Sequence, residues 1–191
     1  MQKQSAKNSG FTLIELVVTV SLAGILMAVA IPSFVEAIKS NRLTTQANEF
    51  MAALNLARSE AIKRGVQVTV QRKGSTSGAW EEGWNVFVDS DADETFSDDG
   101  DTNPCEANAD GSPSEDCLLK TYPALTGSTL RTGNSTYKNY AAYAASGLSI
   151  NSSQVDTFTL CQGTDTSLSR EIKISSTGRA RISVGTAPSC P

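Results

Sequence analysis

The sequence contains no histidine. Histidine is the commonest general base and the commonest metal ligand in proteins, so its absence excludes histidine-dependent catalysis and most zinc chemistry. The chain also lacks a G-x-S-x-G nucleophile motif and a glycine-rich phosphate loop, and its many Ser and Asp residues are better explained by loop composition. We therefore expect neither an enzymatic activity nor a cofactor.

Charge is nearly absent from the N-terminal apolar run. From Phe11 to Phe34, Glu15 is the only charged residue among side chains that are mostly Leu, Ile, Val and Ala. About 20 such residues, at about 1.5 Å each, match a hydrocarbon layer of about 30 Å, which favours a membrane-spanning helix. A secretory signal peptide is the alternative, because Lys3 and Lys7 precede the run. The length of the run, its early carboxylate and the amphipathic pattern that follows favour the spanning helix.

Glu15 places a carboxylate near the start of this helix, where a charge is expensive and is normally kept for a partner. A new amino terminus would be the nearest partner, because cleavage between Gly10 and Phe11 puts a cationic amine one helical turn away. The stretch G-F-T-L-I-E, residues 10–15, resembles the prepilin peptidase site of type IV pilins and type II secretion pseudopilins. The resemblance implies cleavage after Gly10, N-methylation of Phe11 and a role for Glu15 in registering subunits in a filament.

The helical pattern continues well beyond the apolar run. Pro32 predicts a kink or a locally loosened helix, because proline lacks an amide donor. Apolar residues then recur near helical spacing, and Arg64-Gly65 supplies a basic last turn with a glycine stop. We divide the chain into a leader (1–10), a membrane-spanning half of the helix (11–34), an amphipathic half (35–64) and a globular β-rich domain (65–191).

Strand patterns follow the helix. Residues 66–71 and 84–88 alternate apolar and polar side chains around a turn, which predicts a hairpin, and later strands are expected at 118–122, 140–144, 157–161, 171–175 and 179–184. The W-x-x-G-W-x-V-F-x-D run from Trp80 to Asp89 resembles the core hairpin of the FimT/GspH group of minor pilins and pseudopilins. This resemblance implies an α+β type IV pilin fold, in which the long helix packs on a mainly antiparallel sheet.

Residues 89–116 are rich in Asp, Ser, Gly and Asn and predict a long solvated loop. Alternating carboxylates at Asp89, Asp91 and Asp93 suit a hard cation such as Ca²⁺, so a calcium site is one interpretation and a merely solvated loop is the other. The pattern departs from an EF-hand loop, because Glu94 stands where glycine is required and Gly100 where the closing glutamate belongs.

All the cysteines lie beyond the apolar helix. Their even number on the exported side predicts disulfides in an oxidising compartment. Of the possible connectivities we favour the local pairs Cys105–Cys117 and Cys161–Cys190. A four-thiolate zinc site is the alternative, but the chain lacks close C-x-x-C spacing.

Charge is distributed unevenly along the globular domain. Residues 81–116 contain thirteen acidic residues and no Lys or Arg, whereas residues 117–191 contain seven Lys or Arg and three acidic residues. A basic C-terminal third in an acidic chain favours a surface that accepts polyanions. In an extended segment Arg179 and Arg181 would share one face about 7 Å apart, close to the spacing of successive phosphates. Gly178 lets the backbone turn just before them.

The G-R-x-R stretch, residues 178–181, also resembles the DNA-binding element of FimT-type minor pilins of competent bacteria. The resemblance implies that Gly178, Arg179 and Arg181 form this element. Supporting charges are expected from Lys173, Arg170, Lys138 and Arg131. Two arginines on one strand face are otherwise a common way of guarding a solvated sheet edge.

These features predict a minor pilin that binds extracellular DNA during uptake in natural transformation. After processing by prepilin peptidase it would span the inner membrane, with its globular domain in the periplasm, and then join other major and minor pilins in a pilus. The alternative is a structural role in priming or tip assembly, either of a type IV pilus or of a type II secretion pseudopilus.

Overall fold

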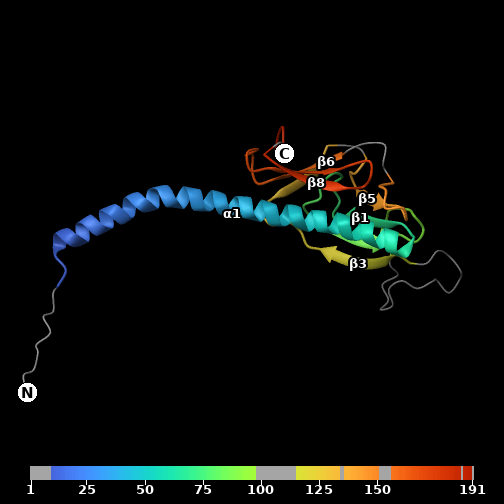
Figure 1. Cartoon of the computed structure of the whole chain (residues 1–191), viewed down its shortest axis with the longest axis horizontal. Helices are drawn as coiled ribbons and strands as arrows, with labels where there is room; N and C mark the ends of the chain where they lie inside the picture. The colour runs from blue at the N-terminus through green and yellow to red at the C-terminus, as the bar shows by residue number, and fades with distance from the viewer. Residues whose placement is uncertain (1–9, 98–114, 134–135, 151–155, 186, 191) are drawn as a thin grey trace, which may run out of the picture. The chain divides into compact units, whose positions relative to one another are not determined.

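The computed structural model describes residues 10–97, 115–133, 136–150, 156–185 and 187–190. The chain divides into two compact units, residues 1–39 and residues 40–191. One helix, α1 (Leu13–Arg64), contributes to both units (Figure 1). The predicted helix over residues 11–64 therefore differs from the observed helix only at its first two residues.

The N-terminal end of α1 is capped by its own sequence. The amide of Glu15 donates a hydrogen bond to Thr12 Oγ1 at 3.3 Å, and the T-x-x-E spacing is that of a capping box. The carboxylate of Glu15 also lies in the first helical turn, where the helix dipole favours negative charge. Glu15 thus has a local role in starting its own helix. Pro32 does not break α1, which stays helical through this position.

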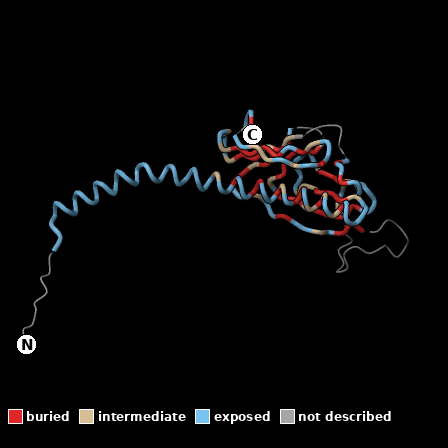
Figure 2. Tube along the Cα trace, viewed as in Figure 1, coloured by how far each residue is buried: buried red, intermediate tan, exposed pale blue. Residues whose placement is uncertain are grey.

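The apolar side chains of the first unit are exposed along the whole segment (Figure 2). Phe11, Leu13 and Val29 are 79%, 80% and 74% exposed. In the part of the chain that the structure describes, α1 is the one helix long and apolar enough to span a membrane, with a mean hydropathy of 2.4 in its most apolar window. An apolar surface of this extent is suited to lipid or to other helices.

In the second unit α1 is amphipathic. Residues buried at intervals of three or four positions form one face: Leu43, Ala47, Phe50, Leu54, Ala57 and Ala61. The helix ends where Gly65 takes a φ of 71° and donates its amide to the Ala61 carbonyl at 2.9 Å. The predicted glycine stop is confirmed.

The described strands form two four-stranded sheets, in which every pairing is antiparallel. The first has the order β3-β2-β1-β5 and comprises β1 (Val68–Arg72), β2 (Trp84–Val88), β3 (Cys117–Tyr122) and β5 (Tyr140–Tyr143). The second has the order β4-β6-β7-β8 and comprises β4 (Thr129–Thr132), β6 (Asp156–Cys161), β7 (Arg170–Ile174) and β8 (Ala180–Val184).

The predicted fold, a long helix packed on mainly antiparallel strands, is confirmed, and the strands are divided between two sheets. The hairpin of β1 and β2 is confirmed, with Val70 opposite Val86. The sequence pattern does not predict β4, because its four residues contain one apolar side chain, Leu130. This short strand is defined by its pairing with β6, where Leu130 lies opposite Leu160, and that pairing is not visible in a local pattern.

Phe50 of α1 lies at the centre of the core. Its ring meets Trp84 of β2 at 4.9 Å between centroids and Phe158 of β6 at 4.8 Å, both edge to face. Trp80, in the segment before β2, meets the same ring at 5.3 Å. All four rings are fully buried. A single helical side chain therefore contacts both sheets.

The loop predicted over residues 89–116, which we call the acidic loop, is more buried at its ends than its composition predicts. Asp89 and Asp116 are 2% and 3% exposed. Asp116 accepts hydrogen bonds from the amides of Ser90 and Ser97 at 3.0 and 2.8 Å, and so holds the two ends of the loop together. Between them, most of residues 90–97 are exposed, as expected for a solvated loop.

A disulfide joins Cys161, at the end of β6, to Cys190 near the C-terminus, with their Cα atoms 5.7 Å apart. Cys117 is also disulfide-bonded, whereas Cys105 lies outside the described residues, so the pair Cys105–Cys117 stays a prediction. The zinc alternative is wrong, because Cys117, Cys161 and Cys190 are engaged in disulfides.

We expect Phe50→Ala to lower the free energy of unfolding by about 3–5 kcal/mol, because it opens a cavity where three aromatic rings meet. Urea unfolding of the full chain in detergent micelles, followed by the fluorescence of Trp80 and Trp84, measures the change. Ile62→Ala is the control on the same helix, since Ile62 is 53% exposed. Equal losses in the two variants would contradict the central role of Phe50.

Candidate functional site: a basic hollow on β7 and β8

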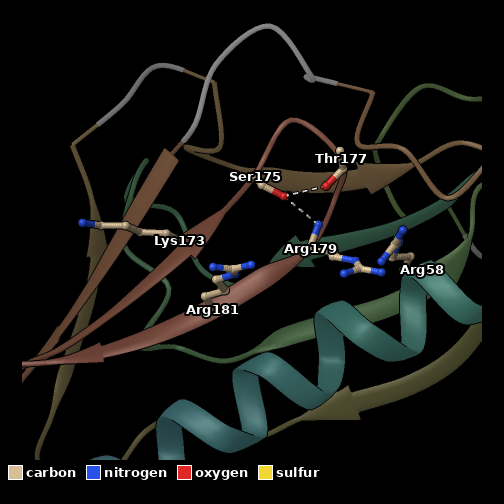
Figure 3. A pocket seen from close by; sticks show the side chains of 6 residues that line it. All are labelled: Arg58, Lys173, Ser175, Thr177, Arg179 and Arg181. Atoms are coloured by element: carbon tan, nitrogen blue, oxygen red, sulfur yellow. Dashed lines mark hydrogen bonds between the residues drawn. The ribbon is translucent and has the colours of Figure 1, made fainter.

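A hollow of about 590 Å³ lies between α1 and the hairpin of β7 and β8 in the second sheet. We call it the basic hollow, and its lining residues are Arg58, Lys173, Ser175, Thr177, Arg179 and Arg181 (Figure 3). The hollow therefore brings together a helix and a hairpin that lie more than a hundred residues apart in the sequence.

The hairpin of β7 and β8 sets the positions of three of the cations. Lys173 and Arg181 are directly opposite one another in the ladder. The turn between the strands is closed by the amide of Gly178, which donates to the Ser175 carbonyl at 2.8 Å. The Ser175 hydroxyl accepts the amide of Arg179 at 3.1 Å (Figure 3). The hydrogen bonds of the turn therefore fix the backbone position of Arg179.

Both the backbone conformation at residue 178 and the closeness of its neighbours favour glycine there. Its φ is 76°, in the left-handed region that glycine tolerates best. A Cβ atom there would lie 2.7 Å from the Gly147 carbonyl oxygen and 3.1 Å from the Tyr143 ring. The backbone at Gly178 therefore packs directly against the loop that follows β5.

The same carbonyl also positions Arg58. The Nε atom of Arg58 donates to the Gly147 carbonyl at 2.8 Å. Figure 3 shows the guanidinium groups of Arg58 and Arg179 pointing toward one another, with Arg181 further along β8. Gly147 is therefore the point at which the helix and the hairpin are brought together.

The basic hollow carries unpaired positive charge. Among the described residues no carboxylate lies within ion-pair distance of Arg58, Arg179 or Arg181. Lys173 differs, because its ammonium pairs with Glu171 at 3.2 Å. Guanidinium groups that face one another without a carboxylate produce a positive potential, and their planar donors match phosphate or carboxylate oxygens.

The structure corrects the prediction that Arg170 supplies a supporting charge for DNA binding. Arg170 is 4% exposed, although it is adjacent in sequence to this surface. Its guanidinium donates to the carbonyls of Leu168 and Ser169 at 2.8 and 3.1 Å, and to the hydroxyls of Ser40 and Thr44 on α1, both at 3.0 Å. The bonds to Ser40 and Thr44 fasten β7 to α1, and the buried guanidinium of Arg170 has no access to a ligand.

Arg131 and Lys138 also lie outside the basic hollow. Arg131 of β4 forms an ion pair with Glu81 and lines a different hollow. Lys138 is exposed in the segment before β5. Of the predicted cations, the fold thus gathers Lys173, Arg179 and Arg181.

Arg58 is the residue that sequence reasoning missed. It stands on the amphipathic half of α1, where a charge between buried positions is ordinarily part of a solvated face. Only the tertiary contact with Gly147 distinguishes it from the other cations of the helix.

A long helix that is apolar in its first half and packs by its second half on antiparallel sheets defines a type IV pilin-like subunit. The profile of the family described as type II transport protein GspH matches residues 46–178, and the chain belongs to this family. The prokaryotic N-terminal methylation motif matches residues 5–31. The predicted resemblance to the FimT/GspH group is confirmed.

Solved structures show the same fold. Two crystal structures of the type IV minor pilin FimU of Pseudomonas aeruginosa PAO1 are each 21% identical to this chain. Their TM-scores are 0.58 and 0.57, and the matches cover 79% and 78% of this chain and 96% and 100% of the FimU chains. No curated protein sequence matches the chain.

We expect Gly178→Ala to destabilise the protein more than Gly163→Ala does. Both glycines have positive φ, 76° and 68°, so each alanine carries a conformational penalty of about 1–2 kcal/mol. Gly163 has open space where its Cβ would lie, whereas Gly178 has the Gly147 carbonyl. The difference between the two urea midpoints therefore measures the contact, and equal midpoints would show that Gly178 is needed for its conformation alone.

Proposed function

We propose that this chain is a minor pilin that binds extracellular DNA through the basic hollow, as part of DNA uptake in natural transformation. The observation that carries the proposal is the convergence in one hollow of Arg58, Arg179 and Arg181, none of which pairs with a carboxylate among the described residues. Arginine forks bind phosphate oxygens through two donors at once, and they stay charged at every physiological pH.

The chemistry of the hollow supports binding to the DNA backbone without sequence preference. Its lining consists of cations and hydroxyls, which suit phosphate oxygens, and no aromatic side chain on which a base could stack is among the described lining residues. A few charges supply weak, salt-sensitive binding in each subunit. Several copies in one pilus would then increase the overall affinity through avidity.

The double change Arg179→Gln and Arg181→Gln should weaken DNA binding and flatten its salt dependence. Each lost phosphate contact reduces the slope of log K against log salt by about 0.9 for duplex DNA. Fluorescence anisotropy with the full chain in detergent micelles, at a series of salt concentrations, measures both quantities, and Arg58→Gln should act in the same direction.

Lys138→Gln is the matched control, because it removes one exposed positive charge outside the basic hollow. We expect a smaller change from Lys138→Gln than from Arg58→Gln, and almost none in the salt slope. Equal effects would mean that net charge, and not the hollow, governs binding. Unchanged binding in the arginine variants would refute the proposal.

A structural role in priming or tip assembly is the second candidate function. The exposed apolar side chains of residues 11–38 favour it, because assembly through helix packing requires only this surface. Counting pili and measuring transformation frequency in cells that carry the arginine double variant separates the two. Normal piliation with reduced transformation supports DNA capture, whereas normal values of both support assembly alone.

We also propose that prepilin peptidase cuts between Gly10 and Phe11, that Phe11 is then N-methylated and that the mature chain spans the inner membrane with its second unit in the periplasm. The match to the N-terminal methylation motif supports this. The new amine would lie one turn from Glu15, which is already placed in the first turn of α1. That pair, within one chain or between neighbours, would register the subunit among other pilins.

Mass spectrometry of the purified protein should therefore show a chain that begins at N-methylated Phe11. Glu15→Gln should be cleaved normally but recovered in smaller amounts from sheared pili, because it keeps the size of the side chain and removes the charge that pairs with the amine. A terminus at Met1 would contradict the processing, and normal recovery of Glu15→Gln would contradict the role of the charge.

A further inference from the structure

Three carboxylates meet where the acidic loop begins. One carboxylate oxygen from each of Asp89, Asp91 and Asp93 lies within 4.8 Å of the other two. Asp89 directly follows β2, and the other two stand in the exposed segment beyond it. None of them forms an ion pair with a Lys or Arg in the described residues. Negative charges this close repel one another unless a cation lies between them.

Asp89 is buried, and its neighbours donate hydrogen bonds to only one of its two carboxylate oxygens. Its Oδ2 atom accepts hydrogen bonds from the Thr69 hydroxyl at 2.7 Å, the Gln67 amide group at 2.8 Å and the Glu94 backbone amide at 3.1 Å. Its Oδ1 atom is also buried, and no donor among the described residues reaches it. A buried carboxylate oxygen without a donor or a cation is costly, so the structure calls for a further partner.

Glu94 stands where an EF-hand calcium loop requires glycine, but its backbone adopts the conformation that the glycine would supply. In calcium loops with carboxylates at the first, third and fifth positions, the sixth is a glycine because the chain turns sharply there. Glu94 occupies that position with a φ of 63° and so adopts the conformation that glycine normally supplies. Its amide at the same time donates to Asp89, which ties the turn to the first carboxylate.

The geometry points to a Ca²⁺ site formed by Asp89, Asp91 and Asp93, which fastens the start of the acidic loop to Gln67 and to Thr69 of β1, both of which donate hydrogen bonds to Asp89. Ca²⁺ fits better than Mg²⁺, because it accepts about six to eight oxygen ligands in irregular geometry, whereas Mg²⁺ demands a near-ideal octahedron. Backbone carbonyls and water complete such a shell in other calcium loops. The site is separate from the basic hollow and does not depend on DNA binding.

Thermal unfolding of the full chain in detergent micelles, in EDTA and in about 10 mM CaCl₂, tests the site. For an affinity near 1 mM, which is common in extracellular calcium modules, we expect the midpoint to rise by about 3–6 °C. Equal concentrations of MgCl₂, and NaCl at the same ionic strength, should give a much smaller rise. Titration calorimetry with CaCl₂ should show one site per chain.

Asp91→Asn with Asp93→Asn removes two ligands that are exposed, so the variant should fold normally in EDTA. In this variant the rise caused by Ca²⁺ should disappear. Glu82→Gln is the matched control, since Glu82 is an exposed acid in the same acidic block and lies outside the cluster. It should keep the full rise. An absent rise in the wild type, or an equal rise in the double variant, would overturn the proposal.

Discussion

The packing around the Phe50 ring is the interaction on which the rest of the second unit depends. Hydrogen-bonded ladders join strands only within each sheet, and in the described chain Ala79 and Arg131 form the one isolated bridge from the segment before β2 to β4. The two sheets are therefore held together chiefly by side chains. Phe50 meets Trp84 from one sheet and Phe158 from the other, so the helix acts as the shared partner of both.

This arrangement explains how the arginines of the basic hollow are positioned without an ion pair to any described carboxylate. Arg58 follows Phe50 by two helical turns on α1, and Gly147 belongs to the loop after β5 of the first sheet. Gly178 closes the hairpin of the second sheet. The lining of the hollow comes from α1 and from this hairpin, and the Gly147 carbonyl lies against both. Because Arg58 is held by a backbone carbonyl and Arg179 by its own amide, neither guanidinium needs a carboxylate to be positioned.

Much of the fold could be predicted from local sequence. The apolar run, the glycine stop at Gly65 and the hairpin of β1 and β2 follow from periodicity and turn chemistry, which act over a few residues. The short strand β4 and the split into two sheets depend on pairings between distant segments, such as Leu130 with Leu160, and local propensity carries no information about these.

The candidate site likewise contains residues that local sequence predicts and residues whose positions depend on distant parts of the chain. Alternation predicted that Arg179 and Arg181 share one face, because side-chain direction in a strand has a period of two, and both side chains line the basic hollow. It failed for Arg170, which lies on the same hairpin but points at α1, and for Arg58, whose neighbours come from elsewhere in the chain. Charge counted along a sequence does not distinguish an arginine that holds the fold together from one that is free to bind.

The buried guanidinium of Arg170 has a mechanical consequence for a protein that works in a filament. Of the hydrogen bonds described between α1 and a strand, its bond to Ser40 lies nearest the N-terminus. Tension applied along the helix would load the charge-assisted bonds from Arg170 to Ser40 and Thr44, which precede Phe50 on α1. Arg170 is therefore the first hydrogen-bonded link through which a pull on the helix would reach the sheet that carries the basic hollow.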